Sequence, residues 1–452
     1  MSEHNFSRRI FLLGSAAGLA GCSTVPSLKR MGYKSPNEKL NCAAIGAGGK
    51  GESDIGPCKG ENVVALCDPD WRQAARSFRN FPDAKKYKDF REMLDKEKTL
   101  DAVTVSTPDN VHAVAAMACI KRGLHVYVQK PLTHDIYEAR MLKEAARKYG
   151  VATQMGNQGH SEEGIRVCCE LIWAGAIGNV REVHAWTNRP IWPQGIPNML
   201  DAEPIPEDDE GKPSIDWDVW LGPAPYRPFN HAYAPFNWRG WYDFGCGALG
   251  DMACHILDAP NWALMLSGGP TSVECIKIEG RNKQTFPNKS IIKFEFPARG
   301  SMCALDLYWY DGGLLPPRPA DIPEDVRLGE GDNGSLFIGD KGYLTTGTYA
   351  GGTRLLPKEL DDAWKGKAPK VLTRAPGNNH HQDWLRACKG GEPAGSNFDY
   401  AAPYTEWILA GSISTRFEGK LEYNAEKMRF TNNKEANQYV KRQYRKGWSL
   451  NM

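Results

Sequence analysis

The feature that most constrains the fold of this chain is a glycine-rich turn that directly follows a short apolar run. The run "LNCAAI" ends at Ile45, and Gly46, Gly48 and Gly51 then follow in the spacing G-x-G-x-x-G. Only this copy follows an apolar run of strand length, and the context predicts a strand, a tight turn and a helix of a parallel α/β sheet. Two further copies of the spacing occur elsewhere, at Gly245/Gly247/Gly250 and at Gly329/Gly331/Gly334.

The next predicted strand supplies a carboxylate where a bound dinucleotide requires one. "VVALCD" ends in Asp68, 22 residues after Gly46, and an acidic residue there accepts hydrogen bonds from the adenosine ribose. Asp68 would repel the extra phosphate of NADP, so NAD is the expected cofactor. Gly46 permits the turn, Gly48 lets backbone N–H groups approach a pyrophosphate, and Gly51 allows close helix packing, while Pro57 shortens the helix. The predicted cofactor contacts in this turn are Gly46, Gly48, Gly49, Lys50 and Gly51.

Strands and helices continue to alternate as far as residue 158. The strand predicted at 100–108 ends at Pro108, and an amphipathic helix is predicted over 110–123. "LHVYVQKP", "THDIYEARMLKEAARKYG" and "VATQMGNQ" predict a further strand, helix and strand. Such alternation is typical of parallel strands joined by right-handed crossovers, so we expect residues 40–158 to form a Rossmann NAD-binding domain.

Three junctions at the carboxyl ends of these strands carry polar side chains, and ligands of such sheets bind there. They are "STPDNVH" (Ser106–His112), "VQKPLTH" (Val128–His134) and "GNQGH" (Gly156–His160). We expect His112 to pack beside the cofactor rather than to react. The predicted cofactor contacts here are Thr107, Pro108, His112, Lys130 and Asn157, and the predicted substrate contacts are Gln158 and His160.

The pattern changes after residue 158, where predicted strands follow one another without intervening helices. "VREVHAWTN", "TSVECIKIEG", "SIIKFEFPA", "SMCALDLYWYDG" and "GSLFIGDKGYLTTG" predict an antiparallel sheet. Helices are predicted in "SEEGIRVCCELIWAGAIG", "NHHQDWLRACKGG" and "YAAPYTEWILAGSISTRFEG". We therefore expect residues 159–452 to form an α+β domain with a large open antiparallel sheet.

Two long segments without regular structure, residues 189–245 and 312–334, are expected to form walls or lids of a site. The first is rich in aromatic side chains, on which the apolar C–H faces of a sugar ring stack. We expect at least half of these rings to pack in the core or at a subunit interface instead. Its aromatic residues include Trp192, Trp217, Trp220, Tyr226, Tyr233, Trp238, Trp241 and Tyr242. The predicted substrate residues here are Arg189, Trp192 and Arg239, with Asn188 as a further polar partner.

The first 22 residues carry two short motifs in an order that predicts export. In "SRRIFLLGSAAGLAGCS", the paired Arg8 and Arg9 precede a short apolar run that ends in Leu-Ala-Gly-Cys at Cys22. The arginines resemble a twin-arginine export signal, and the end of the run resembles a lipoprotein box that would lipidate Cys22. We expect residues 1–22 to be an export signal, residues 23–39 a linker, and the mature protein to be periplasmic and lipid-anchored.

Composition narrows the function classes further. The net charge is +2 and no stripe of Lys and Arg is present, so nucleic acid is not an expected partner. No apolar run is long enough to span a bilayer, which leaves the lipid anchor as the expected membrane contact. The 12 cysteines form no C-x-x-C pair and no repeated spacing, so neither a metal site nor a disulfide framework is expected.

The chain resembles the Gfo/Idh/MocA family, which includes glucose–fructose oxidoreductase and inositol dehydrogenase, over nearly its whole predicted mature length. The resemblance is carried by the glycine turn, "TPDNVH", "KP", "AGAIGNVREVHA" and "GALGDMACHILD". It implies a small carbohydrate substrate, a nicotinamide cofactor and a homo-oligomer formed through the second-domain sheet. Family members usually have Glu before Lys-Pro, whereas Gln129 here alters the electrostatic surroundings of Lys130.

The resemblance also implies three catalytic residues, Lys130, Asp251 and His255. In the family, an Asp-x-x-x-His pair on a helix of the second domain and the lysine of Lys-Pro face the nicotinamide. Oxidation of a sugar hydroxyl needs a base for its proton, a role that suits a histidine, and a lysine stabilises negative charge on the oxygen. Asp251 would orient the imidazole or hold a neighbouring hydroxyl.

Together these features predict an NAD(P)-dependent oxidoreductase acting on a hydroxyl or keto group of a sugar or glycoside, with C3 as the candidate carbon. Because free cofactor is scarce outside the cytoplasm, an exported enzyme would hold its cofactor tightly and acquire it before export. Two alternatives remain. One is an NAD-dependent glycoside hydrolase that works by transient oxidation and elimination, and the other is a sugar-binding or regulatory protein without turnover.

Overall fold

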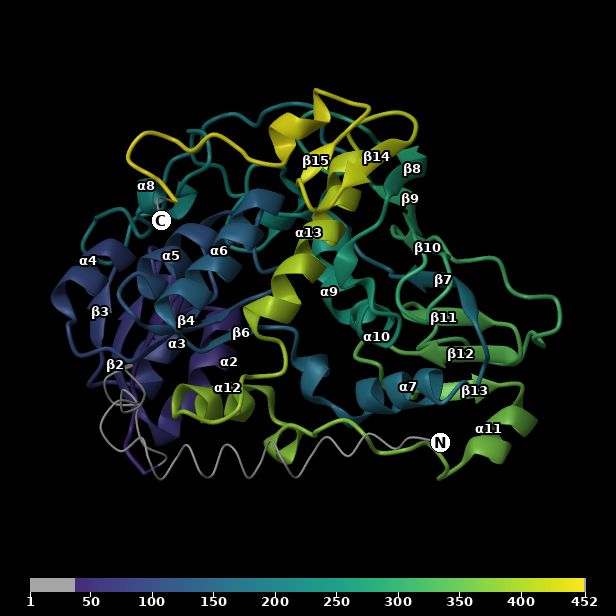
Figure 1. Cartoon of the computed structure of the whole chain (residues 1–452). Coiled ribbons are helices and arrows are strands. Elements are labelled where there is room, and N and C mark those ends of the chain that lie inside the picture. The colour runs from purple at the N-terminus through teal and green to yellow at the C-terminus, as the bar shows by residue number, and fades with distance from the viewer. Residues whose placement is uncertain (1–36, 451–452) are drawn as a thin grey trace.

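The computed structural model describes residues 37–450, which form two sheets with helices between and around them (Figure 1). The six-stranded sheet has the order β3-β2-β1-β4-β5-β6, and the nine-stranded sheet has the order β13-β12-β11-β7-β10-β9-β8-β14-β15. The predicted export signal, with Arg8, Arg9 and Cys22, and most of the predicted linker lie outside the described residues.

The six-stranded sheet is parallel throughout and confirms the predicted Rossmann fold. Its strand order, with β1 and β4 at the centre, is that of a doubly wound dinucleotide-binding sheet. The sequence pattern left residues 69–99 unassigned, and these form helix α3 (Trp71–Asn80), strand β3 and helix α4 (Phe90–Lys96). The strands are β1 (Asn41–Ile45), β2 (Asn62–Cys67), β3 (Lys85–Tyr87), β4 (Ala102–Val105), β5 (His125–Val128) and β6 (Thr153–Met155).

Both faces of this sheet are buried. Consecutive residues of a strand point to opposite sides, and both sets belong to apolar clusters. On β1, Ala43 and Ile45 join one apolar cluster, whereas Cys42 and Ala44 join another. Helix α2 (Lys50–Ile55) ends before Pro57 as predicted, and the 3-10 helix η2 (Gly56–Gly60) follows it. Helix α5 (Asp109–Ile120) corrects the expectation of an amphipathic helix, since all its residues but Ala118 are buried.

The second sheet is mostly antiparallel, as predicted, and contains one parallel pair. Strand β7 (Val180–Trp186) runs parallel to β10 (Leu305–Tyr310), and the other pairs are antiparallel. Strands β8 and β9 lie between β7 and β10 in the sequence but on the far side of β10 in the sheet, so the parallel pair joins distant segments, which no local pattern reveals. The remaining strands are β8 (Ser272–Glu279), β9 (Lys289–Phe296), β11 (Gly334–Gly339), β12 (Gly342–Thr346), β13 (Arg354–Leu356), β14 (Leu421–Asn424) and β15 (Arg429–Phe430).

Helices of the second domain cover one face of this sheet and also reach the nucleotide domain (Figure 1). Helix α13 (Phe398–Ser414) packs against α6 (Ile136–Tyr149) of the nucleotide domain and α9 (Gly247–Ile256) of its own. Helix α12 (His380–Cys388) places Trp384 in the apolar cluster of the Rossmann sheet. The other helices of this part are α7 (Glu163–Trp173), α8 (Trp217–Leu221), α10 (Asp258–Ala263) and α11 (Lys358–Trp364).

The C-terminal segment makes a further connection between the domains. Arg442 Nη2 donates to Glu138 Oε1 of α6 at 2.9 Å and to the carbonyl oxygen of Asn110 at 2.6 Å. The predicted domain border at 158/159 therefore separates the two sheets, whereas the packing of later segments crosses it.

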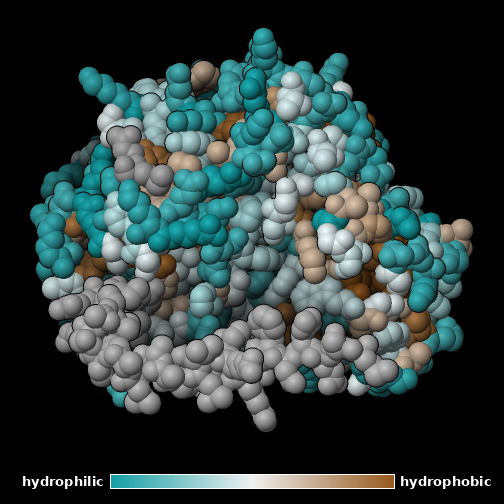
Figure 2. All heavy atoms as spheres, in the orientation of Figure 1, coloured by the Kyte–Doolittle hydropathy of each residue, from teal (hydrophilic) through white to brown (hydrophobic). Residues whose placement is uncertain are grey.

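Hydrophilic residues cover most of the described surface in the view of Figure 2, and hydrophobic residues show in smaller patches between them. Within residues 37–450, no helix combines the length and the apolar character that a bilayer crossing requires.

Gly51 offers a direct test of the turn that begins the first domain. A Cβ atom at this position would lie 1.7 Å from the carbonyl oxygen of Gly46, which is a backbone atom and not the end of a flexible side chain. Gly51→Ala should therefore lower the free energy of unfolding by about 3 kcal/mol or more. Gly56→Ala is the matched control, because nothing lies within 4 Å of a Cβ there, and it should change stability by less than about 1 kcal/mol. Equal effects in denaturant unfolding would contradict the close packing at Gly51.

Candidate active site

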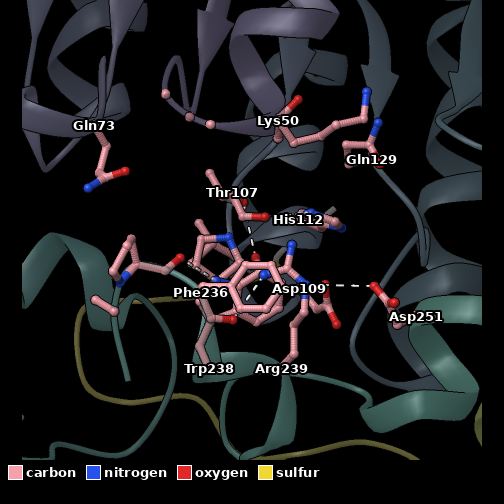
Figure 3. Close-up of a pocket in the computed structure, with 18 of the residues that line it drawn as sticks. Lys50, Gln73, Thr107, Asp109, His112, Gln129, Phe236, Trp238, Arg239 and Asp251 are labelled. Carbon is pink, nitrogen blue, oxygen red and sulfur yellow. Dashed lines mark hydrogen bonds and ion pairs between the residues drawn. The ribbon is translucent and has the colours of Figure 1, made fainter. Parts of the chain in front are cut away.

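A cavity of about 720 Å³ lies where the carboxyl edge of the Rossmann sheet meets the second domain. Figure 3 shows Lys50 and Gln129 entering from the nucleotide domain and Phe236, Trp238, Arg239 and Asp251 from the second domain. The structure thus brings most of the predicted site residues to one cavity. Those that line it are Gly46, Gly48, Gly49, Lys50, Asp68, Thr107, Pro108, His112, Lys130, Gln158, Arg189, Trp192, Arg239, Asp251 and His255.

The glycine turn has the predicted shape. Gly46 has a φ of 77°, and a Cβ there would meet the backbone of Ser106 at 2.7 Å. Gly51 does not line the cavity but packs against Gly46 as expected. Gly48 packs closely on helix α3, because a Cβ there would lie 2.5 Å from the backbone of Gln73, and this packing by itself already requires a glycine.

Asp68 lies at the end of β2 and faces the glycine turn. Its Oδ2 accepts a hydrogen bond from the backbone N of Gly48 at 2.9 Å, and its Oδ1 accepts one from the backbone N of Asp70 at 2.9 Å. Burial raises its pKa to about 6, although these hydrogen bonds oppose the shift. The carboxylate is therefore held in place before any ligand arrives, with lone pairs left for the hydroxyls of a ribose.

Gln129 is tied to a buried carboxylate that the sequence analysis missed. Gln129 Nε2 donates to Asp54 Oδ2 at 3.0 Å, and Ser106 Oγ donates to the same oxygen at 2.8 Å. Lys50 Nζ forms an ion pair with Asp54, and His381 of α12 also faces it. Burial alone would raise the pKa of Asp54, but the bonds from His381 and Lys50 outweigh it and lower that pKa. Asp54 thus provides a fixed negative charge next to Gln129, and its only sequence signal is its position four residues after Lys50.

Lys130 and Asp251 form an ion pair across the two domains. Lys130 Nζ donates to Asp251 Oδ1 and to the carbonyl oxygen of Asp251, both at 2.8 Å, and both side chains are 16% exposed. Burial raises the pKa of Asp251, but the charges of Lys130 and Arg239 outweigh it and lower that pKa. An ammonium has three N–H donors, so one remains for a ligand in the cavity.

His255 follows one turn after Asp251 on α9 and lines the same cavity. The structure corrects the expectation that Asp251 orients its ring, because within residues 37–450 His255 Nδ1 is buried without a hydrogen-bond partner. The ring instead packs edge-on against Tyr349, with 4.8 Å between the centroids. Burial, followed by the charge of Lys130, lowers the pKa of His255 well below its usual value, so the ring is neutral at neutral pH and can accept a proton.

Arg239 is held over the cavity between two aromatic rings. Its guanidinium carbon lies 4.4 Å from the ring centroid of Phe236 and 4.3 Å from that of Trp238, and its Nε lies 3.6 Å from Asp251 Oδ1. Trp192 and Trp220 line the cavity as well, and Tyr226 is 68% exposed. The expectation of packing is confirmed for Trp217, Tyr233 and Trp241, which belong to one buried aromatic cluster, while Tyr242 is buried against Phe286.

Asp109, at the start of α5, is a cavity carboxylate that the sequence pattern did not single out. Its Oδ2 accepts a hydrogen bond from the backbone N of Cys246 at 3.0 Å. Burial raises its pKa to about 7, against the opposing charges of Arg239 and Lys130. The sequence signal was its place inside "TPDNVH", directly after the predicted cofactor contacts Thr107 and Pro108.

Two predicted ligand contacts, Asn157 and His160, lie behind the cavity wall instead of in it. Asn157 Nδ2 donates to Asp258 Oδ2 at 2.9 Å, and His160 Nδ1 lies 3.1 Å from both carboxylate oxygens of Asp258. Both are fully buried, so they support α10 rather than touch a ligand. His112 lines the cavity, and its two ring nitrogens lie 2.9 Å from the carbonyl oxygens of Pro131 and Thr107, which agrees with a packing role beside the cofactor site.

The cavity residues fit a dinucleotide. Gly48 and Gly49 leave a stretch of wall without side chains, and a Cβ at Gly49 would meet nothing within 4 Å. Asp68 lies beside this stretch, and Lys130 and His255 belong to the same cavity. Among the described residues, no cluster of three or more His, Cys, Asp or Glu side chains is suited to hold a metal ion.

Residues 40–157 match the family described as oxidoreductases with an NAD-binding Rossmann fold, and residues 186–292 match the C-terminal alpha/beta domain of the same family. The chain belongs to the Gfo/Idh/MocA family. Both matched segments contribute to the cavity, the first through the glycine turn and Lys130, and the second through Arg239, Asp251 and His255.

Two proteins similar to this chain are named as dehydrogenases of scyllo-inositol and of levoglucosan. A scyllo-inositol 2-dehydrogenase (NADP+) of Bacillus subtilis is 30% identical over 111 residues, 25% of this chain and 31% of that protein. A levoglucosan dehydrogenase of Pseudarthrobacter phenanthrenivorans is 22% identical over 279 residues, 61% of this chain and 57% of that protein. The chain therefore matches about a third of the first relative and somewhat more than half of the second.

The fold is shared with the WlbA dehydrogenase of Bordetella pertussis, solved in complex with NADH and UDP-GlcNAcA. The TM-score is 0.58 at 15% sequence identity, and the match covers 85% of this chain and 99% of that one.

Asp109 makes stability depend on pH in a predictable direction. Its pKa is about 7 in the folded protein, against an ordinary value of 3.8. Protonation of Asp109 therefore stabilises the folded state, and this stabilisation is fully present below about pH 4 and is lost as the pH rises through 7. The wild type should lose about 4 kcal/mol relative to Asp109→Asn over this range, because one pKa unit is worth about 1.4 kcal/mol. Denaturant unfolding between pH 4 and 8 measures this difference. Asp95→Asn, at an exposed carboxylate, is the control, and parallel curves for wild type and Asp109→Asn would show that Asp109 ionises normally.

Proposed function

We propose that this protein is an NAD(P)-dependent oxidoreductase that interconverts a hydroxyl and a keto group on a sugar or glycoside. The observation that carries the proposal is the convergence of Lys130 and His255, from different domains, on one cavity beside a dinucleotide-binding turn. When bound, a nicotinamide cofactor supplies the hydride acceptor or donor. All other roles fall to side chains of this chain.

The residues divide the work as follows. His255, neutral at neutral pH, takes the proton of the reacting hydroxyl. Lys130 donates its remaining N–H to the same oxygen and stabilises the negative charge that develops there, while Asp251 keeps the ammonium in position. The loop that carries Trp192 and Arg239 forms the opposite wall. The aromatic face suits the apolar C–H face of a sugar ring, and the guanidinium suits its hydroxyls.

A glycoside, with C3 as the carbon that reacts, is the substrate class that we propose. The names of the similar dehydrogenases, which refer to inositol and levoglucosan, support a cyclic polyol or sugar. The aromatic and guanidinium groups of the cavity wall also support a ring with several hydroxyls rather than a linear substrate.

The localisation and assembly proposals rest on other parts of the chain. Arg8, Arg9 and Cys22 support export by the twin-arginine route and a lipid anchor at the periplasmic membrane, which membrane fractionation of expressing cells would test. A homo-oligomer is supported by Tyr308 and Ile338, which lie partly buried on the sheet face away from the helices, and light scattering measures its mass.

Replacement of Lys130 or His255 by Ala should lower kcat/KM for glycoside oxidation by about 10²- to 10⁴-fold, because the charge-stabilising donor or the base is lost. The measurement is the change in nicotinamide absorbance on addition of a panel of sugars and glycosides. Lys212→Ala and His231→Ala, at exposed positions of the loop 189–245, are the controls and should leave the rate unchanged. Wild-type protein that binds the cofactor but oxidises no member of a broad panel would refute the proposed activity.

An aryl glycoside separates this activity from the hydrolytic alternative. Oxidation produces NADH in step with a keto product, whereas the alternative releases free aglycone without net NADH. Release of aglycone by the wild type, lost in Lys130→Ala, would show that the protein is the hydrolase and not the proposed dehydrogenase.

Asp68 should make NAD the preferred cofactor over NADP, because its carboxylate binds ribose hydroxyls and repels a phosphate in their place. Asp68→Ser should weaken NAD binding by about 10- to 100-fold and NADP binding much less, since the charged hydrogen bonds are lost for NAD only. Titration calorimetry with each cofactor measures both. An unchanged ratio of the two affinities would show that Asp68 does not contact the adenosine ribose.

A further inference from the structure

A segment of the second domain, residues 213–222, crosses over the nucleotide domain on the side of Asp68. We call it the strap. It contains α8, which Asp216 caps by accepting a hydrogen bond from the backbone N of Val219 at 3.1 Å. The strap belongs to the long loop 189–245, which the sequence analysis assigned to a substrate wall. Its contacts, however, are with the part of the Rossmann sheet that binds the adenosine half of a dinucleotide.

One end of the strap is fixed to the β2–α3 turn that follows Asp68. Asp70 and Ile215 form an antiparallel backbone bridge, and the backbone N of Asp216 donates to the carbonyl oxygen of Pro69 at 2.9 Å. Lys88 Nζ, from the segment after β3, donates to the carbonyl oxygen of Pro213 at 3.1 Å. The strap therefore attaches to the rim of the cavity where the adenosine ribose site lies.

The other end of the strap is fixed across the cavity, at the start of α5. Asn110 Nδ2 donates to the carbonyl oxygen of Leu221 at 2.9 Å, and Gly222 packs so closely on Val111 that a Cβ would approach it to 2.7 Å. Arg445, near the C-terminus, donates from Nη2 to the carbonyl oxygens of Asp218 and Gly222. Anchors on both rims mean that the strap spans the groove instead of bordering it.

Three strap side chains line the same cavity as Asp68, Pro69 and Gln73. They are Ile215, Val219 and Trp220, and Ile215 and Trp220 are 1% and 7% exposed. Trp217 lies behind them, stacked on Trp220 with 4.6 Å between the ring centroids. The adenosine end of the cavity thus has an apolar wall that the Rossmann domain does not itself supply.

We infer that the strap forms the second wall of the adenosine site and retains a bound dinucleotide. The inference rests on the proposed function, to which it adds three cofactor contacts, Ile215, Val219 and Trp220. With the strap closed, the adenosine leaves only after the bridge at Ile215 and the bonds at Asp216 and Asn110 open together. Dissociation is therefore slow, and the protein carries its cofactor through many catalytic cycles.

The dissociation rate of NADH from the loaded protein tests the strap without any sugar. The bound fluorescence is followed after addition of excess NAD+ to wild type, Val219→Ala, Trp220→Ala and Trp192→Ala. Val219→Ala and Trp220→Ala should each raise the rate by about tenfold, because apolar contact with the adenosine is lost and such losses act mainly on dissociation. Trp192→Ala, at another part of the cavity wall, is the matched control and should change the rate less than about twofold.

Val219→Ala keeps the test decisive if Trp220→Ala fails to fold, because Val219 is not part of the buried aromatic cluster. An unchanged dissociation rate in Val219→Ala would overturn the inference that the strap retains the cofactor, and it would leave the proposed function standing. An equal increase in Trp192→Ala would also overturn it, since general loosening of the cavity would then explain the effect. Wild-type protein that binds no dinucleotide would overturn the proposed function itself.

Hydrogen exchange gives a second measurement that does not depend on these substitutions. Loading with NADH should slow exchange of the strap peptides, including the amide of Asp216, because opening must then displace the ligand. Peptides of α11, which lies away from the cavity, should exchange at the same rate with and without NADH. A strap that exchanges equally fast in both states would contradict its role in retention.

Discussion

The ion pair between Lys130 and Asp251 is the interaction on which the proposed chemistry depends. It links the end of a Rossmann strand to a helix of the second domain, and both side chains are largely shielded from water. Removal of one partner of such a pair leaves the other charge unpaired, which costs far more than the pair contributes. The position of His255 follows from the same contact, because it lies one turn further along α9.

Two carboxylates of the cavity differ in charge state because their partners differ. Asp251 contacts Lys130 directly and stays ionised, whereas Asp109 has a backbone N–H as its hydrogen-bond donor and a pKa of about 7. Groups whose surroundings separate their pKa values in this way are typical of sites that move protons. Near pH 7 the net charge around Lys130 and Arg239 therefore depends on the state of Asp109.

Sequence patterns predicted what depends on local spacing and missed what depends on packing. The glycine turn, Asp68 and the Asp251–His255 pair each follow from a short motif, and the structure places all of them at the cavity. Asn157 and His160 follow a strand in the same manner, yet both turn to Asp258, which is about a hundred residues away in the sequence. The parallel pairing of β7 with β10, the burial of α5, Asp54 and the strap likewise arise from contacts between distant segments, which no local pattern encodes.

The return of later segments to the nucleotide domain has a consequence for how a substrate is admitted. Helix α12 inserts Trp384 into the Rossmann core, and Arg442 bonds to Glu138 and Asn110. Hinge bending, by which many two-domain enzymes close around their ligands, would break these contacts. These contacts oppose such a closure, so the width of the cleft is tied to the packing of the segments that return to the nucleotide domain.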